Sequence, residues 1–495
     1  MSARIPRYPE PPYCWSGTTS SVNPYSLLVS LEGARLGHCG IASDIRRIFT
    51  ALALDSKIDL GGLIFPSGPA GINRQRRIKA LEASAILHEL QSDPEPRRRI
   101  GRIIRLVRSG LESYGDIVRR HDLTPFESDV FEDVIWRLFF AGHAPQKARS
   151  EIMKASFHYA RFLPRPHLQG RSPWPFAAPP KLDIGQYRAI LFQEMRPVRL
   201  PHHVVKFVRY HDAIPVTDPD LVNDHQAARM HMVTLTQCAR DSHFVCNSRA
   251  TRNALLRLRP DLEPYAHVIP AIVEAPRAVP KLDLQTVVDA RALKGGGNGD
   301  AAVSAGRRSG GLRAFVLAVA PLEPKKNVPV IVEGWARSVS RKQGVKLLIV
   351  GGAGWKSAVS ERSIAPYLQS GEIVRLAGLS DDELGMLYRR AAVLVFPSLA
   401  EGFGLPPVEA LHAGTPVIAS NIPAFREVLE DAALYVDPYD PEDLATKLDS
   451  LVIEEGAAQK HARLKERSVS VLQKYQSKAV SEQWLRLLET AKPRR

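Results

Sequence analysis

The chain has 495 residues, and ordinary domain sizes therefore predict two or three domains with ample core for each. Its hydrophobic content of 44% and charged content of 24% are ordinary for a soluble globular protein. No apolar run is long enough to span a bilayer, and the first residues, MSARIPRYPEPPY, lack the apolar core of a signal peptide. These features predict a cytoplasmic protein.

The formal net charge is +15, which favours anionic partners such as nucleotides, nucleic acid or an acidic membrane surface. No RNA- or DNA-binding signature accompanies this charge, so we expect no nucleic-acid partner. The four cysteines have neither metal-type nor redox-type spacing, which predicts free thiols and no metal site.

In chain order, residues 1–24 are rich in Pro, Ser and Tyr and are expected to form an irregular arm. Apolar strand patterns then alternate with amphipathic helix patterns, which is typical of a parallel sheet covered by helices. We expect an N-terminal Rossmann-like domain over residues 25–275. Its predicted strands are 26–31, 57–65, 188–192, 204–210, 244–246 and 266–270.

A long Arg-rich segment, from about residue 72 to 180, lies between the second and third of these strands, and a minimal Rossmann unit does not need it. Apolar residues recur at helical spacing from Ile100 to Leu111, and five arginines between residues 98 and 108 cover much of the remaining surface. We expect a helical insertion. Its basic helix either packs on its own domain with a solvated basic face or lies on anionic lipid or an acidic partner.

Residues 276–311 are expected to separate two domains, because the run from Leu293 to Gly311, LKGGGNGDAAVSAGRRSGG, cannot bury a core. A second strand–helix alternation follows and predicts a C-terminal Rossmann-like domain over 312–467. Its predicted strands are 314–319, 346–350, 372–376, 393–396, 417–419 and 434–436. The remaining residues, 468–495, are helical by pattern.

The stretch from 393 to 417, VLVFPSLAEGFGLPPVEALHAGTPV, holds the strongest functional pattern. An uninterrupted apolar run is typical of a buried parallel strand, and Pro406 and Pro407 suit the first turn of the helix that follows. The intervening glycine-hinged loop therefore ends at a helix N-terminus, whose free amides bind anions such as phosphates. Two carboxylates, Glu401 and Glu409, would then lie beside the anion.

Carboxylates beside a phosphate repel it, so we expect Glu401 and Glu409 to accept hydrogen bonds from hydroxyls of a sugar or ribose. A generic βα loop with two solvated acids is the plainer alternative. With seven residues between them, the two glutamates match the Glu-x7-Glu signature of the retaining GT-B glycosyltransferases called group 1 or family 4. The flanking segments GTPVIAS (414–420) and ALYVDPYDPEDLA (433–445) are also similar to that family.

The resemblance covers nearly all of residues 312–450 and thinner patches of 26–270. It implies an α/β fold of GT-B type, with two Rossmann-like domains facing across a cleft, the helical insertion in the first, and the last helix crossing back to the N-terminal domain. LEPKKN, EGFGLPPVEA and the His-Asp-x-Ile-Pro segment at 211–215 most resemble bacterial mannosyltransferases of O-antigen and exopolysaccharide assembly.

Several site residues are implied by the resemblance alone. PLEPKKN, at 321–327, is similar to the loop whose lysine binds the donor diphosphate, which assigns that role to Lys326 and leaves Lys325 where arginine is common. Many members carry a second phosphate-binding arginine six residues before this lysine, but here that residue is Ala320. Lys325, Arg209 or another base is expected to compensate.

The other implied contacts come from both domains. Glu409 should bind the ribose, and Glu401 should bind the donor sugar or steady positive charge at its anomeric carbon. His211 should contact that sugar from the N-terminal domain. The remaining expected donor-binding positions are Gly40, Ile41, Gly352, Leu376, Phe403, Gly404 and Leu405.

The resemblance therefore implies a retaining hexosyltransferase that moves a sugar, with mannose from GDP-mannose as the first expectation, to a glycan or lipid-linked acceptor hydroxyl in bacterial surface polysaccharide synthesis. We expect no metal and no cofactor besides the nucleotide-sugar donor, and a location that is cytoplasmic or peripheral at the inner face of the plasma membrane. Two alternatives stay open: a nucleotide-sugar epimerase of GT-B fold and a catalytically silent GT-B scaffold.

Overall fold

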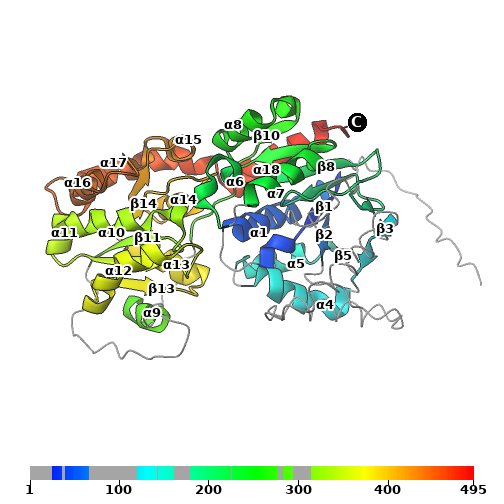
Figure 1. The fold of residues 1–495 in the computed structure, drawn as a ribbon. Coiled ribbons are helices and arrows are strands. Elements are labelled where there is room, and N and C mark those ends of the chain that lie inside the picture. Colours follow the sequence, from blue (N-terminus) through cyan, green and yellow to red (C-terminus); the bar gives the residue numbers. More distant parts are fainter. Residues whose placement is uncertain are drawn as a thin grey trace, which may run out of the picture.

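The computed structural model describes residues 25–35, 40–65, 120–126, 128–141, 143–160, 179–223, 226–276, 283–293 and 314–494. They form two α/β domains side by side, drawn blue to green and yellow to brown in Figure 1. The N-terminal sheet has eight strands in the order β10-β9-β8-β7-β1-β2-β5-β4, and the C-terminal sheet has six in the order β13-β12-β11-β14-β15-β16. Among the described strands of these two sheets, only the β4–β5 pair is antiparallel.

The N-terminal domain contains the following elements: β1 (Tyr25–Ser30), η1 (Glu32–Arg35), α1 (Gly40–Ala53), β2 (Ile58–Ile64), β3 (Arg120–Asp122), β4 (Thr124–Pro125), α4 (Ser128–Ile135), η2 (Trp136–Phe140), η3 (Gln146–Ala148), α5 (Arg149–Ile152), β5 (Ser156–Tyr159), β6 (Lys181–Asp183), β7 (Ala189–Phe192), β8 (Val205–Tyr210), α6 (Ile214–Thr217), η5 (Pro219–Leu221), α7 (Ala227–Cys238), β9 (Ser242–Cys246), α8 (Arg249–Leu258), η6 (Pro260–Tyr265) and β10 (Ala266–Val268).

The second domain and the C-terminal end contain these elements: α9 (Leu284–Arg291), β11 (Phe315–Val319), η7 (Pro324–Lys326), α10 (Val328–Arg337), α11 (Val339–Lys342), β12 (Lys346–Val350), α12 (Ala358–Ser370), β13 (Ile373–Leu376), α13 (Asp381–Arg390), β14 (Val393–Phe396), α14 (Leu405–His412), β15 (Val417–Ser420), α15 (Pro423–Leu429), η8 (Glu430–Ala432), β16 (Leu434–Val436), α16 (Pro441–Val452), α17 (Ala457–Gln473) and α18 (Ser477–Thr490).

The predicted strands of both sheets are confirmed. Their apolar runs suit strands of a parallel sheet, which helices cover on both faces. β14 is the clearest case, since all four of its residues are buried. Side-chain caps fix the first residues of two helices. Ser248 caps α8 by accepting from the Thr251 amide, and Ser380 forms a capping box with Glu383 at α13.

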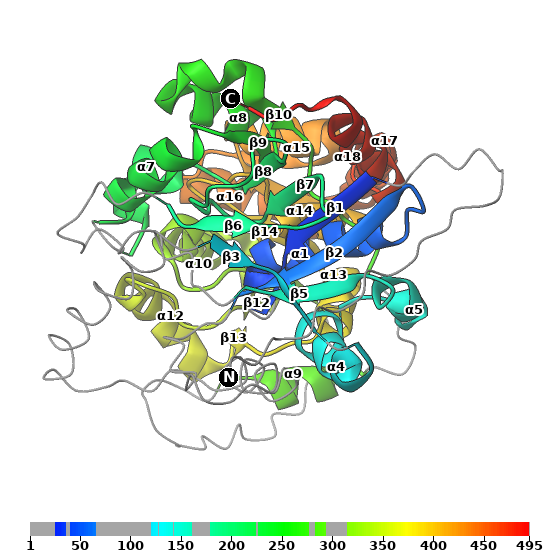
Figure 2. The same cartoon turned by 90° about the vertical axis from the view of Figure 1, so that its right-hand side faces the viewer.

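The segment expected as a helical insertion differs from the prediction. Its described part holds helices α4 and α5 but also three strands, and β5 pairs with β2 in the main sheet. Figure 2 shows β1, β2 and β5 side by side. A helix prediction missed β5 because its sequence, SFHY, is too short to establish a period. The Arg-rich helix around residues 98–108 lies outside the described residues.

Residues 283–293 also differ from the expected linker. They form α9, whose Val287 and Val288 are buried in the second domain, and Leu293 donates from its amide to the Arg375 carbonyl at 2.8 Å. The glycine-rich run from 294 onward lies outside the described residues.

The last helix, α18, packs on the N-terminal domain, so the C-terminal end of the chain lies there (Figure 1). Val480 and Trp484, both fully buried, belong to the same apolar cluster as Ile45 and Phe49 of α1. The chain therefore passes between the domains twice.

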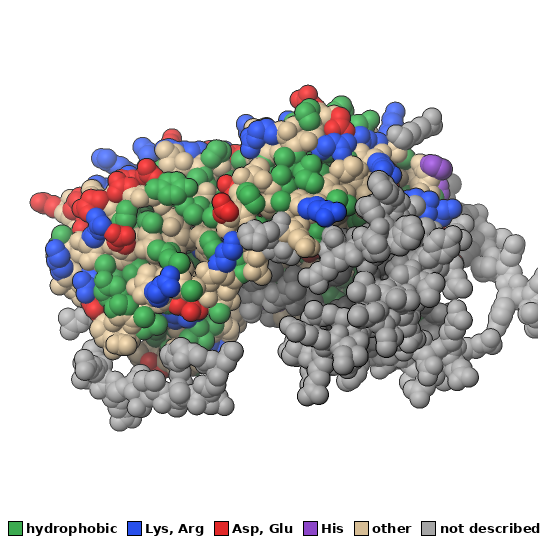
Figure 3. All heavy atoms as spheres, viewed as in Figure 1, with side chains coloured by type: hydrophobic (Ala, Val, Ile, Leu, Met, Phe, Trp, Pro, Cys, Tyr) green, Lys and Arg blue, Asp and Glu red, His purple; other side chains and the backbone are tan. Residues whose placement is uncertain are grey.

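The described surface is electrostatically mixed on the face drawn in Figure 3, where blue and red side chains are interspersed with apolar ones. Cys238 and Cys246 are free and buried, as predicted, while the other two cysteines lie outside the described residues. None of the helices in the described ranges is both long and apolar enough to cross a membrane.

Candidate active site

The loop after β14 begins helix α14 through a glycine that no other residue replaces easily. Gly404 has φ +85° and precedes Leu405, the first helical residue, with the two prolines at the next positions. A side chain at Gly404 would also meet the ring of Phe425 at 2.4 Å. The sequence thus fixes a tight turn that presents the amides at the α14 N-terminus.

Two of the predicted site residues, Lys326 and Glu401, are brought into direct contact. Lys326 Nζ donates to Glu401 Oε1 at 2.5 Å, and the side chains are only 13% and 10% exposed. The ammonium also lies 4.7 Å from the centre of the Phe396 ring. Asn327 holds the lysine loop in place by donating to the Pro397 carbonyl at 3.0 Å.

Burial and neighbouring charge compete at two carboxyl groups of this site, and their pKa values shift in opposite directions. Burial raises the pKa of Glu401, but the ammonium groups of Lys326 and Lys325 outweigh burial and hold this pKa below its ordinary value. Burial raises the pKa of Glu323, and the same two lysines offset that effect only in part. Glu401 is therefore an ionised carboxylate held against a cation.

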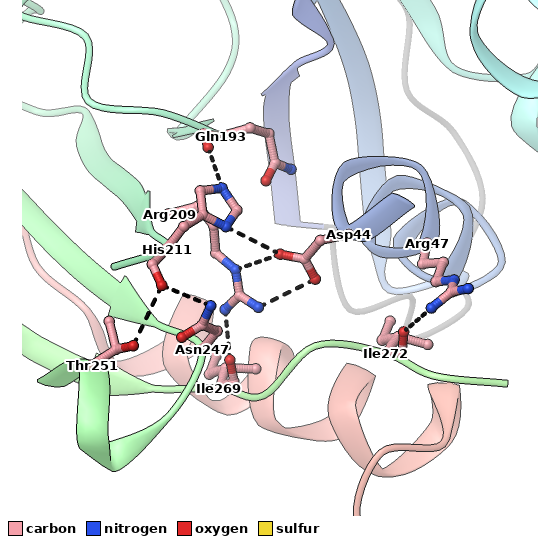
Figure 4. Close-up of polar contacts among 9 residues, drawn as sticks. All are labelled: Asp44, Arg47, Gln193, Arg209, His211, Asn247, Thr251, Ile269 and Ile272. Atoms are coloured by element: carbon pink, nitrogen blue, oxygen red, sulfur yellow. Dashed lines mark hydrogen bonds and ion pairs between the residues drawn. The ribbon is translucent and has the colours of Figure 1, made fainter. Parts of the chain in front are cut away.

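Glu409 lies at the interface with the N-terminal domain. Arg47 of α1 donates from Nη2 to Glu409 Oε1 at 2.7 Å, and Tyr388 donates its hydroxyl to Oε2 at 3.1 Å. Arg47 also donates to the Ile272 carbonyl at 3.2 Å (Figure 4). Burial and the charge of Glu409 raise the pKa of Tyr388 well above its ordinary value, so the phenol stays a donor.

Arg47 is a candidate functional residue that sequence reasoning missed. It is one of 67 Lys and Arg residues, and no motif singles it out. The one sequence signal that could have indicated Arg47 is its position in the second turn of the helix that starts at Gly40.

His211 follows the last residue of β8 and lies in a buried polar group of the N-terminal domain (Figure 4). Its Nε2 is 2.9 Å from the Gln193 carbonyl, which requires a proton on that nitrogen, and its Nδ1 is 4.0 Å from Asp44 Oδ2. Its own carbonyl accepts from Asn247 Nδ2 at 3.0 Å.

Arg209 forms a buried ion pair with Asp44 in the same group. Its Nε donates to Asp44 Oδ2 at 2.8 Å, its Nη1 donates to the Ile269 carbonyl at 2.6 Å, and the side chains are 0% and 4% exposed. This engagement makes Arg209 unsuitable as the substitute for the missing phosphate-binding arginine.

The loop containing Glu401 touches the His211 segment across the domain interface. A β-carbon at Gly402 would lie 2.0 Å from the His211 carbonyl oxygen. Ser248 and Thr251, at the start of α8, donate their hydroxyls to the Gly402 carbonyl at 2.6 and 3.1 Å. The structure thus brings Glu401, Lys326 and His211 into one region.

The N-termini of α1 and α14 approach each other. A β-carbon at Gly40 would be 3.6 Å from Leu405, so this predicted residue lies beside the predicted loop. Ile41 packs partly on the N-terminal core. Phe403 and Leu405 bury their side chains, which leaves their amides as the groups to offer a ligand.

The glycine loop after β12 and the end of β13 lie on the same sheet edge. A β-carbon at Gly352 would have open space around it. Leu376 is fully buried, and its carbonyl accepts from the Gly351 amide at 2.9 Å. Ala320 is buried against the backbone of Gly351. Lys325 Nζ lies 3.9 Å from Glu323, at the edge of the Lys326–Glu401 pair.

No trio of His, Cys, Asp or Glu side chains able to hold a metal ion occurs within the described ranges.

Residues 307–470 match the family model described as glycosyl transferases group 1. The chain is 37% identical over 129 residues to the O-antigen chain mannosyltransferase RfbU of Salmonella typhimurium. This alignment covers 26% of this chain and 35% of that protein. It is also 34% identical over 177 residues to a phosphatidyl-myo-inositol mannosyltransferase of Mycobacterium tuberculosis. That alignment covers 34% of this chain and 44% of the relative. These alignments span less than half of each relative's length.

Solved structures resemble nearly the whole chain. Sucrose-phosphate synthase from Thermosynechococcus elongatus superposes with a TM-score of 0.55 at 16% identity, covering 94% of this chain and 98% of that one. HepE of Anabaena, solved in complex with UDP-glucose, gives a TM-score of 0.52 at 13% identity, covering 94% and 100%. At such identities the likeness concerns the fold, which is the expected GT-B arrangement of two Rossmann-like domains.

Proposed function

We propose that the chain transfers a sugar from a nucleoside diphosphate donor to an acceptor hydroxyl, since residues 307–470 match the group 1 glycosyltransferases. The observation that carries this proposal is the contact between Lys326 and Glu401 in the loop between β14 and α14, whose next residue, Gly402, lies against the His211 carbonyl of the other domain.

The positively charged groups around the Lys326–Glu401 contact suit a diphosphate. The N-termini of α14 and α1 approach each other at Leu405 and Gly40, and the positive end of each helix dipole favours an anion. Lys326 supplies a full positive charge, which would stabilise the negative charge that develops on a departing diphosphate. Lys325 is our candidate to substitute for the arginine that Ala320 replaces, since Arg209 is bound to Asp44.

The two glutamates fit the hydroxyls of the donor. Glu401 is ionised and directly precedes Gly402, which lies against the His211 carbonyl, and this suits it to sugar hydroxyls or to positive charge at the anomeric carbon. Glu409 keeps acceptor capacity beside Arg47 and Tyr388, because an ionised carboxylate has about four lone-pair sites. We assign Glu409 to the ribose.

The names of the relatives support mannose as the donor sugar and GDP-mannose as the first donor to test. On the same likeness we propose retention of anomeric configuration and a glycan or lipid-linked acceptor in bacterial surface polysaccharide synthesis. The acceptor would approach from the N-terminal domain, which carries His211.

A turnover assay tests the proposal. Purified protein is incubated with GDP-mannose, with and without a lipid-linked glycan fraction, and GDP release and the sugar products are followed by mass spectrometry and NMR. GDP release and glycan extension that depend on the glycan fraction support a transferase. A new epimer formed from donor alone supports the epimerase, and donor binding without any turnover supports the silent scaffold.

We further propose that the Arg-rich segment contacts an anionic membrane while the chain remains on the cytoplasmic side. The test is flotation with anionic vesicles. Deleting residues 72–180 would remove β5 from the main sheet, so the deletion must be confined to 72–119. Loss of flotation supports the membrane contact, and unchanged flotation contradicts it.

A further inference from the structure

The side chain of Gln193 is a buried amide without a hydrogen-bond partner. Gln193 is 2% exposed, and within the described part of the chain neither its Oε1 nor its Nε2 has a partner. Exchanging the two atoms would not change this result, because both are unpaired. A buried polar group of this kind destabilises the fold unless something else satisfies it.

The backbone of the same residue is fully used, so its position is fixed. The Gln193 amide donates to Ser30 Oγ at 3.0 Å, and the Gln193 carbonyl lies 2.9 Å from His211 Nε2. Figure 4 shows the side-chain amide beside His211 and Asp44. The unpaired groups are therefore held by a rigid support.

A second unpaired amide oxygen lies in the same group. Asn247 is 7% exposed and donates its Nδ2 to the His211 carbonyl at 3.0 Å, while no described residue donates to its Oδ1. The orientation of Asn247 is thus set, and its oxygen is left as an acceptor.

Topology explains why these residues are together. Gln193, His211 and Asn247 each follow directly on a strand, namely β7, β8 and β9, and these neighbours are parallel. Their side chains therefore gather at the carboxyl edge of the sheet, where open α/β sheets bind ligands. The opposite domain contributes Gly402, next to Glu401, against the His211 carbonyl.

The chemistry of the group selects a neutral ligand rich in hydroxyls. Asp44 and Arg209 are buried and pair with each other, so their charges are already compensated. What remains is one NH2 group with two N–H donors and two acceptor oxygens, which match sugar hydroxyls because each hydroxyl both donates and accepts. A phosphate would find no free cation here among the residues just named.

We propose that Gln193, with Asn247 Oδ1, binds hydroxyl groups of the sugar at the reacting end of the site, and so helps to determine which sugar is accepted. This inference rests on the proposed glycosyltransferase function. The sugar is either the one on the nucleotide donor or the one on the acceptor, and the two sources are separable.

The test compares Gln193→Met, which keeps length but removes both hydrogen-bonding groups, with Gln237→Met. Gln237 on α7 also has a side-chain oxygen without a described partner, so it is a matched control. Gln193→Leu serves as a second variant if the first folds poorly. Calorimetric probes are GDP-mannose, GDP and octyl α-D-mannoside, and melting temperature reports the fold.

We expect Gln193→Met to melt no lower than wild type and to bind GDP about as tightly. Loss of about tenfold affinity for GDP-mannose assigns the donor sugar, and the same loss for octyl mannoside assigns the acceptor sugar. Gln237→Met should change neither affinity.

Unchanged sugar affinities in Gln193→Met overturn this inference but leave the proposed function standing. Wild type that binds no nucleotide sugar overturns the proposed function, and this inference with it.

Discussion

Arg47 Nη2 and Glu409 Oε1 lie 2.7 Å apart and join the two domains at the carboxylate assigned to the donor ribose. Arg47 comes from the second turn of α1, whose N-terminus faces α14, and it also donates to the Ile272 carbonyl. The orientation of Glu409 is therefore coupled to the apposition of the domains.

Arg47→Gln should loosen this apposition. The pair is 26% and 13% exposed, so its loss should lower the free energy of unfolding by about 1 kcal/mol. Small-angle scattering should show a larger radius of gyration. Arg149→Gln, which loses more exposed pairs with Glu132 and Asp133, is the control and should change neither quantity appreciably. An unchanged radius for Arg47→Gln would contradict the coupling.

Asp44→Asn should be strongly destabilising. It leaves the fully buried guanidinium of Arg209 without its counter-charge, which costs about 3–5 kcal/mol in urea unfolding. Arg337→Gln breaks a half-exposed pair with Glu333 and should cost less than about 0.5 kcal/mol. A mild effect of Asp44→Asn would contradict the view that the Asp44 carboxylate is what holds Arg209 in the interior.

Gly402→Ala should disturb the contact between the two domains, whereas Gly352→Ala should weaken binding of the nucleotide without disturbing that contact. The first β-carbon would clash with the His211 carbonyl at 2.0 Å, so the domains must move apart and turnover should fall at least tenfold. The second would meet no protein atom within 4 Å, so its melting temperature should match wild type while nucleotide affinity falls. Equal nucleotide affinity in Gly352→Ala would remove this loop from the donor site.

Glu401 predicts a pH dependence of stability. Its folded-state pKa lies below the ordinary value of 4.5, so the unfolded state binds more protons around that pH. The stability it contributes is therefore present above about pH 4.5 and is lost as the pH falls through the folded pKa. Urea unfolding of Glu401→Gln should show a shallower acid loss than wild type over that window. Parallel curves would mean that Lys326 does not stabilise the carboxylate.

The sequence was most informative where a physical pattern was long or unambiguous. The strand at 393–396 and the tight glycine turn at Gly404 follow from an apolar run, two prolines and a required positive φ. The resemblance then directed attention to Lys326, Glu401 and His211, which the structure places in one region.

What sequence reasoning missed depends on contacts between distant segments. Arg47 and Gln193 carry no local signature, and their environment exists only once α1, β7 and β8 are assembled. The charge of Arg209 makes it a candidate phosphate ligand, yet Asp44, 165 residues away, holds it in the interior. Strand β5 was missed because four residues do not establish a period.

Calorimetric titration of GDP, UDP and ADP sugars into wild type and Glu409→Ala tests the central claim most directly. We predict that one nucleotide family binds selectively and that Glu409→Ala binds it about tenfold more weakly, because the ribose loses a charged acceptor. Binding of none of these sugars, or equal binding by the variant, would contradict the assignment of this site to a nucleotide-sugar donor.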